Sequence, residues 1–572
     1  MKIVAAMLAD YQQTFWGTPS RLREKLGDVQ ISHASLRRFA EIGGVDQHFL
    51  IVQPRDAESA KADCQACGVA NRVHISLIDD GVRPRRELFR LARRWNQTSW
   101  RGGLMNTTWY DEFVAPRLCA VILDTHEADA VFLVDAHHAA LDPVLSSAMI
   151  AQYRAKAGSV RYVFTAAPPG IAGLLLSRAA VAELVEKNLP VGILLTYRPE
   201  FPALDPITDD TCLHVDRAVQ TAAMRFVADT TRSVERLSAA FGELSANASA
   251  LQLCAHSARD GHNFAGPFPA EVEIELTTRD ALQHSHLYPR RTARREETFP
   301  GLNGSAGRRC HTVDDDVRAV DICDADAHAV IRVARELAAY DDRLLVLGGN
   351  GDPLLHPRFP QIVREIVAAG QRNIAVETSL LDAPEASIQA LSDCKVAALM
   401  VRVDAQSRET YAAIHRCDRF DEVIAGIKAI EERRRSQSIA APLLVPLFTR
   451  CRANIHELDA FYDHWIQAVG SATVRTYNDY CGLMPVDDIL RPEPPVRGPC
   501  RQLPRRLTLL AEGSVAQCSQ DVRGAQPLAN WFTQSLAEIW DGTARGELCA
   551  MHERGAWNDN VLCAKCHEWM RP

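Results

Sequence analysis

The chain has 572 residues, of which 47% are hydrophobic and 24% charged. At roughly 100–200 residues per domain, this length predicts about three domains. The net charge of −8 gives no support for broad nucleic-acid binding. No apolar run approaches the roughly 18 residues of a membrane span, so we expect a cytoplasmic protein without signal peptide or membrane anchor. In a reducing compartment, sixteen cysteines favour free thiols and metal ligands over disulfides.

Residues 1–245 alternate strand-like and helix-like patterns. This alternation predicts a mainly parallel, doubly wound α/β domain, closed by a helical stretch over 215–244. The expected strands are Lys2–Leu8, Phe49–Val52, Ala130–Val134, Val160–Thr165 and Val191–Leu195, and the expected helices include Pro143–Lys156 and Arg178–Lys187.

A second strand–helix series begins after residues 246–270, which are rich in Ala, Ser, Gly and Pro and predict a linker. Six such units over 271–477 indicate a full or partial parallel barrel, whose reactive loops lie at the carboxyl ends of its strands. Residues 291–320 interrupt the series, and we expect them to form a mobile loop. The expected strands are Val272–Leu276, Arg343–Leu347, Asn373–Glu377, Ala397–Val403, Leu443–Leu447 and Ala472–Tyr477, and the expected helices include Phe359–Ala369 and Phe420–Arg433.

Four cysteines in residues 478–572 have the spacing of a metal site. Cys500 and Cys518 flank a predicted hairpin that turns at Gly513, and Cys563-x2-Cys566 is a chelating pair. Four thiolates at these spacings suit either zinc or an iron–sulfur cluster, with buried free cysteines as the alternative. Two further cysteines, Cys481 and Cys549, lie nearby in the sequence as spare or neighbouring thiols.

This cysteine pattern, together with Ser535–Trp540, resembles the SPASM domain of radical SAM proteins. Residues 477–485 resemble the join between barrel and SPASM domain in the spiro-SPASM subgroup. The resemblance implies one auxiliary [4Fe–4S] cluster, because the chain ends soon after its last two cysteines. The implied ligands are Cys500, Cys518, Cys563 and Cys566.

The segment LGGNGDPLLHP at 347–357 follows a predicted strand. It resembles the radical SAM loop that holds the amino group of S-adenosylmethionine, in which glycines let the backbone approach the ligand. Residues 376–379 and 401–405 resemble the third- and fourth-strand motifs of that family. The residues implied to bind the cofactor are Gly348, Gly349, Gly351, Asp352, Pro353, Glu377 and Thr378.

The C-x3-C-x2-C signature of that family is replaced here. The positions of its cysteines hold Asp280, His284 and Leu287. Leucine cannot ligate iron, and Asp and His are poor substitutes for thiolates. We therefore expect no radical-generating cluster and no reductive cleavage, and we regard binding of S-adenosylmethionine as doubtful. Two alternatives remain for this segment. It is a solvated loop that has lost its role, or Asp280, His284 and His286 hold a divalent metal.

The predicted strand Ala130–Val134 runs into Asp135, His137 and His138. It resembles the metal-binding strand end of nucleotidyltransferases with a GT-A-like fold. The resemblance implies that Asp135 holds Mg²⁺ against nucleotide phosphates, with a solvated strand end as the alternative. The two histidines are either surface residues or ligands.

Other parts of a nucleotide site are less clear in the sequence. Asp216 or Asp229 could supply a second carboxylate. The loop after the first strand has one glycine, Gly17, whereas backbone amides that cradle phosphates normally need more. Arg21 and Lys25 could contact the phosphates instead.

The sequence thus predicts a nucleotidyltransferase-like domain (1–245), a linker (246–270), a partial (β/α)6 radical SAM-like barrel (271–477) and a small SPASM-like domain (478–572). The leading hypothesis is an iron–sulfur protein of peptide or small-molecule modification. Its degenerate core would act as a substrate-binding or electron-transfer partner of another protein in the pathway. One alternative is a Mg²⁺-dependent nucleotidyl- or glycosyltransferase, with a nucleotide ligand and with the barrel as scaffold. Another is a non-catalytic assembly protein with structural zinc.

Overall fold

A computed structural model of the chain divides into two compact units, described here one at a time. The first comprises 1–263 with 340–342, and the second comprises 264–339 with 343–572. The structure describes residues 1–79, 83–95, 103–196, 205–222, 224–245, 247–259, 268–282, 285–289, 322–490 and 493–571. His284 and the predicted mobile loop at 291–320 lie outside the described residues.

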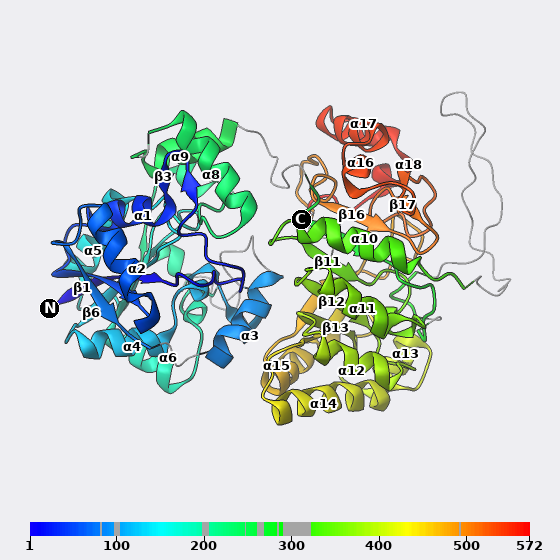
Figure 1. Cartoon of the computed structure of the whole chain (residues 1–572). Coiled ribbons are helices and arrows are strands. Elements are labelled where there is room, and N and C mark those ends of the chain that lie inside the picture. Colours follow the sequence, from blue (N-terminus) through cyan, green and yellow to red (C-terminus); the bar gives the residue numbers. More distant parts are fainter. Residues whose placement is uncertain are drawn as a thin grey trace. The chain divides into compact units, whose positions relative to one another are not determined.

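The first unit is built on a seven-stranded sheet (Figure 1). All seven residues of β1 are buried, as expected for a strand covered on both faces. The strand order is β5-β4-β1-β6-β8-β7-β9, and only β8 runs antiparallel to both of its neighbours. The strands are β1 (Ile3–Ala9), β4 (Gln47–Val52), β5 (Val73–Leu77), β6 (Ala130–Asp135), β7 (Tyr162–Thr165), β8 (Leu174–Ser177) and β9 (Cys212–Leu213), with a separate hairpin of β2 (Lys25–Leu26) and β3 (Val29–Gln30).

Two hydrophobic clusters cover the two faces of this sheet. Alternate residues of β1 enter each cluster, which is the period-two pattern of a strand. Helices α1, α2, α5, α8 and α9 contribute to one cluster, and α4 and α6 contribute to the other. The helices of this unit are α1 (Ile31–Phe39), α2 (Ala57–Ala66), α3 (Arg83–Arg94), α4 (Pro116–Thr125), α5 (Pro143–Lys156), α6 (Arg178–Glu186), α7 (Arg217–Gln220), α8 (Thr231–Glu243) and α9 (Ala250–Arg259).

The strand predicted over Val191–Leu195 is wrong, because this apolar run forms the short 3-10 helix η4 (Val191–Leu194). The carboxylate of Asp111 accepts from the backbone amides of Val191 and Gly192, at 2.7 and 3.1 Å. These amides are thus bonded to a side chain instead of to a neighbouring strand. A Cβ on Gly192 would lie 2.2 Å from the carbonyl oxygen of Asn106, so only glycine fits there.

Two further predictions differ in detail from the structure. The helical stretch expected over 215–244 is interrupted between Gln220 and Thr231, where α7 ends and α8 begins. The segment expected to be a linker contains α9, and its Leu253 and Cys254 are buried in the core of the first unit.

The second unit contains a nine-stranded sheet in which all six predicted strands follow one another in parallel. The order is β15-β14-β13-β12-β11-β10-β16-β17-β18, so the cysteine-rich segment extends the same sheet through β16. The predicted α/β class with parallel sheets is confirmed. The strands are β10 (Glu271–Ile274), β11 (Leu344–Leu347), β12 (Ile374–Thr378), β13 (Ala398–Arg402), β14 (Leu443–Arg450), β15 (Thr473–Thr476), β16 (Arg506–Leu509), β17 (Ser514–Ala516) and β18 (Ala529–Asn530).

Helices alternate with the parallel strands along the chain and lie beside them (Figure 1). Apolar positions of α10 and α11 are buried at helical spacing, which packs these helices against the sheet. The helices are α10 (Ala327–Ala338), α11 (Phe359–Ala368), α12 (Glu385–Asp393), α13 (Arg408–His415), α14 (Phe420–Gln437), α15 (Leu458–Val469), α16 (Leu536–Trp540), α17 (Thr543–Glu553) and α18 (Val561–Lys565).

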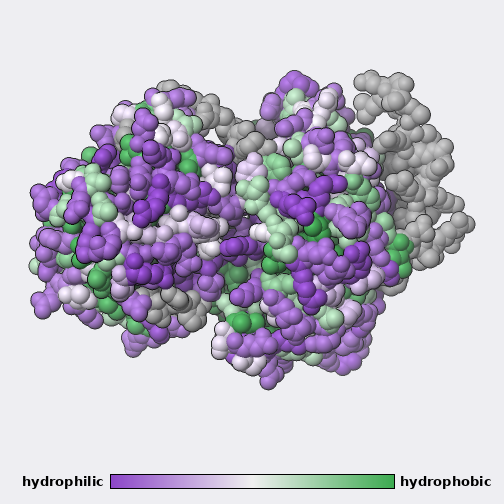
Figure 2. Space-filling view, viewed as in Figure 1, coloured by the Kyte–Doolittle hydropathy of each residue, from purple (hydrophilic) through white to green (hydrophobic). Residues whose placement is uncertain are grey.

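The visible surface of each unit is mainly hydrophilic, with small hydrophobic spots between the polar side chains (Figure 2). Within the described ranges, no helix combines the length and the hydropathy that crossing a membrane requires.

Candidate functional site

The predicted hairpin of the cysteine-rich segment is confirmed. Strands β16 and β17 pair antiparallel, with Thr508 opposite Ala516. Gly513 at the turn has φ +95°, and a Cβ there would lie 2.7 Å from the ring of Phe532. Glycine is therefore required at this turn on two grounds, backbone conformation and space.

The four predicted cysteine ligands are neighbours. Cys500, Cys518 and Cys563 belong to one apolar cluster that also contains Cys549 and Trp557. The charge of a Cys566 thiolate acts on each of the other three predicted ligands. Across the part of the chain that the structure describes, no group of three or more His, Cys, Asp or Glu side chains is arranged to hold a metal ion.

The surroundings of Cys500, Cys518 and Cys563 raise the pKa of each of these thiols, whereas the hydrogen bond with Cys481 lowers the pKa of Cys566. Burial and then the neighbouring thiolates Cys500 and Cys566 raise the pKa of Cys563 to about 12. Burial likewise raises the pKa of Cys518 well above its ordinary value. A metal must displace these protons when it binds, so its affinity increases with pH.

Polar groups that the sequence did not single out contact the same thiols. The Cys563 sulfur accepts from Gln517 Nε2 at 3.1 Å and lies 3.3 Å from His552 Nε2. Because His552 Nδ1 accepts from the Cys500 amide at 3.2 Å, the ring proton belongs on Nε2 and points at the sulfur. Donors to sulfur of this kind are the usual surroundings of a thiolate metal site.

A fifth thiol, Cys481, lies within hydrogen-bonding reach of Cys566. It is buried, and the charge of Cys518 also acts on it. The sequence left its role open, and the structure places it among the thiols predicted to bind metal.

The loop after β11 packs closely against the segment that follows β10. A Cβ on Gly351 would lie 1.8 Å from the carbonyl oxygen of Thr277, and Gly349 has φ +95°. The Asp352 carboxylate is buried and accepts from Thr378 Oγ1 at 2.8 Å and from the Ser379 amide at 2.8 Å. Two of the predicted cofactor-binding side chains, those of Asp352 and Thr378, thus bond to each other and hold the loop.

A buried arginine, Arg402, reaches two more of the predicted cofactor-binding residues. Arg402 Nε donates to Glu377 Oε1 at 3.0 Å, and Nη2 donates to the Gly349 carbonyl oxygen at 2.9 Å. Its Nη1 donates to Asp280 Oδ2 at 3.2 Å. The guanidinium carbon lies 4.6 Å from the centre of the Tyr288 ring, within the range of a cation–π contact.

Two of the three positions that the resemblance aligned with cysteines, Asp280 and Leu287, lie within the described residues. Asp280 is the partner of Arg402, and Leu287 is buried in a small apolar cluster with Ile414, Cys451 and Tyr477. His286 Nε2 lies 3.0 Å from Arg416 Nε. The described residues of this segment therefore make an ion pair and a hydrophobic contact.

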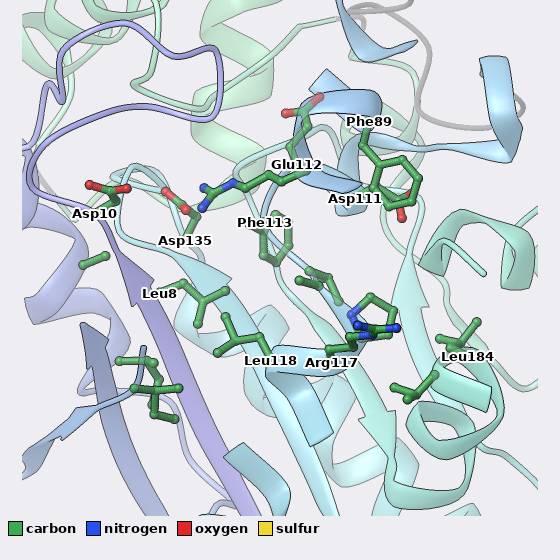
Figure 3. Close-up of a pocket in the computed structure, with 18 of the residues that line it drawn as sticks. Leu8, Asp10, Phe89, Asp111, Glu112, Phe113, Arg117, Leu118, Asp135 and Leu184 are labelled. Atoms are coloured by element: carbon green, nitrogen blue, oxygen red, sulfur yellow. The ribbon is translucent and has the colours of Figure 1, made fainter. Parts of the chain in front are cut away.

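A pocket lies in the first unit where β1 and β6 end side by side. The chain winds outward from β1 to β4 and β5 and returns to β6 on the other side of β1, and ligands bind at such a switch point. Asp10 follows β1 and Asp135 ends β6, and Figure 3 shows both carboxylates at the same end of the pocket. The cavity has a volume of about 90 Å³.

The carboxylate of Asp135 is paired with a histidine. Asp135 Oδ1 accepts from the His137 amide at 2.8 Å and lies 2.8 Å from His137 Nδ1. Burial raises the pKa of Asp135, but the hydrogen bond and charge of His137 outweigh it and hold the pKa at about 2. His138 is buried as well, and burial lowers its pKa to about 4, so neither histidine is a surface residue.

Of the two carboxylates considered beside Asp135, Asp229 is the nearer to this histidine pair. It is buried, its charge interacts with that of His137, and it accepts from Trp16 Nε1 at 2.9 Å. Asp216 caps α7 by accepting from the Ala218 amide instead.

Neither Arg21 nor Lys25, the predicted phosphate contacts, is among the residues that line the pocket. Arg21 pairs with Glu24, and Lys25 is exposed in β2. Two other basic residues, Arg86 and Arg117, line the pocket.

The protein is thus an α/β protein of two compact units, and its cysteine-rich segment extends the sheet of the second unit. Over 244 residues the chain is 30% identical to an uncharacterised protein of Treponema pallidum (strain Nichols), a match that spans 41% of this chain and 67% of that protein. The chain belongs to the same family as this treponemal protein. No protein-family model matches the chain.

Several solved structures resemble parts of the chain. SuiB of Streptococcus suis bound to S-adenosylmethionine matches 56% of this chain and 80% of its own, with 12% identity and a TM-score of 0.37. BtrN in complex with AdoMet and 2-DOIA matches 51% and 91%, with 13% identity and a TM-score of 0.30. A cytidylyltransferase from Leptospira borgpetersenii matches 45% and 94%, with 11% identity and a TM-score of 0.31. At such TM-scores these likenesses carry no argument about this chain.

Proposed function

We propose that the protein binds one [4Fe–4S] cluster through Cys500, Cys518, Cys563 and Cys566. The observation that carries the proposal is that these four thiols, distant in sequence, are neighbours with His552 and Gln517 directed at one of them. Thiolates are the ligands that iron–sulfur clusters require. A bound cluster would accept and donate single electrons, and these residues would hold it in a largely apolar surrounding.

In this proposal the barrel does not generate radicals. Asp280 and Leu287 make an ion pair and a hydrophobic contact where thiolates would be needed. The protein would then serve a modification pathway as an electron-transfer or substrate-binding partner of another protein. Structural zinc at the same thiols is the alternative, and metal analysis separates the two.

The test compares two double variants with the wild-type chain after anaerobic purification. Cys563→Ala/Cys566→Ala should lose iron, sulfide and the brown absorbance. Cys394→Ala/Cys417→Ala is the matched control, because it removes two partly buried thiols of the same unit that lie outside the cysteine-rich segment. Equal iron contents in the two double variants would contradict the assignment of the ligands.

A second candidate function is Mg²⁺-dependent binding of a nucleotide in the first unit, as expected for a nucleotidyl- or glycosyltransferase. The pocket at the switch point favours it, because Asp10 and Asp135 supply carboxylates and Arg86 and Arg117 supply positive charge. Asp135 would hold the metal ion, oriented by its bond to His137.

Titration with a fluorescent nucleoside triphosphate, with and without Mg²⁺, tests this second function. Asp135→Ala should abolish the Mg²⁺-dependent part of the binding. Asp216→Ala should keep it, since this carboxylate caps α7. Unchanged binding in Asp135→Ala would remove the second candidate.

A further inference from the structure

Arg402 brings a positive charge into the interior of the second unit, where its side chain is only 1% exposed. Each of its three nitrogens donates to a different chain segment: to Asp280 after β10, to Gly349 after β11 and to Glu377 in β12. A fork of donors with partners on all sides is the arrangement in which arginine binds most specifically.

The partners of Arg402 are the groups that a cationic cofactor would need. In a loop of this kind the carbonyl oxygen of Gly349 would accept from an ammonium group. Asp280 and Glu377 are the carboxylates beside it. Because the guanidinium group already pairs with all three, a second cation at this place would meet its positive charge at short range.

Neighbouring contacts hold this arrangement in place. The second carboxylate oxygen of Glu377 pairs with Arg475 Nη1 at 2.9 Å. The ring of Tyr288 lies against the guanidinium group, and its hydroxyl donates to Asp404 Oδ2 at 2.6 Å. The side chains on both sides of Arg402 are thus fixed by partners of their own.

We infer that Arg402 is a built-in cation that lies at the carboxyl ends of the parallel strands of the second sheet and excludes S-adenosylmethionine from this place. The cradle of Asp280, Glu377 and the Gly349 carbonyl binds a guanidinium group, and the protein supplies that group itself. The inference concerns the barrel alone and does not depend on a cluster at the four cysteines.

Two measurements test the inference. Equilibrium dialysis of the full wild-type chain with labelled S-adenosylmethionine should show no saturable binding up to about 1 mM, the weak end of ordinary ligand affinity. In Arg402→Ala the cradle loses its cation, and methylguanidinium at millimolar concentration should raise the melting temperature with increasing dose. The wild-type chain and Arg408→Ala should not respond, because Arg408 is an exposed arginine paired with Asp418.

Saturable binding of S-adenosylmethionine to the wild-type chain would overturn the inference whatever the variants do. A folded Arg402→Ala that does not respond to methylguanidinium would overturn it as well. If Arg402→Ala does not fold, Arg402→Lys replaces it: this variant keeps the charge but loses the fork, and it should be less stable than the wild-type chain. Full stability of Arg402→Lys would show that the three directed bonds do not matter.

Discussion

Replacing Glu377 by glutamine keeps the shape of the side chain and removes its charge. Glu377 is 14% exposed and lies between Arg402 and Arg475, at 3.0 and 2.9 Å. Burial raises the pKa of this carboxyl, but the two arginines outweigh burial and lower the pKa from 4.5 to about 2. The gap between these values corresponds to about 3 kcal/mol of folding free energy. Removing one partner of a buried ion pair costs a similar amount, about 3–5 kcal/mol.

We therefore expect Glu377→Gln to lower the free energy of unfolding of the second unit by about 3 kcal/mol at neutral pH. Because the folded-state pKa lies below the unfolded one, the wild-type contribution is complete above pH 4.5 and is lost as the pH falls toward 2. Urea unfolding gives the free energy, and hydrogen exchange of β12 assigns the transition to this unit.

The control is Glu385→Gln, which breaks an ion pair with Arg433 at a side chain that is 74% exposed. Exposed pairs contribute about 0–1 kcal/mol, so this variant should be nearly as stable as the wild-type chain. Equal losses in the two variants, or a Glu377→Gln loss that persists unchanged at pH 2, would refute the reasoning.

Three further predictions concern other parts of the second unit. Gly513→Ala should destabilise this unit by at least about 1 kcal/mol, because its Cβ would meet the ring of Phe532 at positive φ, and thermal unfolding measures the loss. The affinity of the cysteine-rich segment for zinc should rise steadily between pH 6 and 8, because the pKa of Cys563 is about 12 and zinc must displace its proton. A chelator competition measures this affinity, and an affinity that does not change with pH would contradict the prediction. Burial raises the pKa of Glu273 from 4.5 to about 7, so stability should fall as the pH rises through this range. The protonated-carboxyl infrared band at pH 6 should be weaker in Glu273→Gln than in the wild-type chain, and an equal band would contradict the assignment.

Long apolar strands were the most predictable part of the fold. All six predicted strands of the second sheet appear where alternating strand and helix patterns place them. The central four, β11 to β14, are mainly apolar because a parallel strand inside a sheet is buried on both faces. The same rule failed at Val191–Leu195, where an apolar run is buried without being a strand. There Asp111, eighty residues earlier in the chain, bonds the backbone amides, and no local pattern indicates such a partner.

The candidate site was predictable where it depends on cysteine spacing. The hairpin brings Cys500 and Cys518 together, and the short Cys563–Cys566 loop follows from the sequence. His552 and Arg402 could not be found in this way, since their roles depend on contacts between residues distant in the chain. Charged residues in otherwise apolar strands, such as Glu377 in β12 and Arg402 at the end of β13, were a signal of the ion pairs in the second unit.

The most direct test of the proposed function is to count iron and acid-labile sulfide in the anaerobically purified full chain and to record its electron paramagnetic resonance spectrum after reduction. We expect about four irons per chain, as one [4Fe–4S] cluster requires, and a single reduced-cluster signal. Zinc at about one per chain without iron would contradict the account. Two clusters would contradict it as well, because Asp280 and Leu287 make an ion pair and a hydrophobic contact where thiolates of a second cluster would be needed.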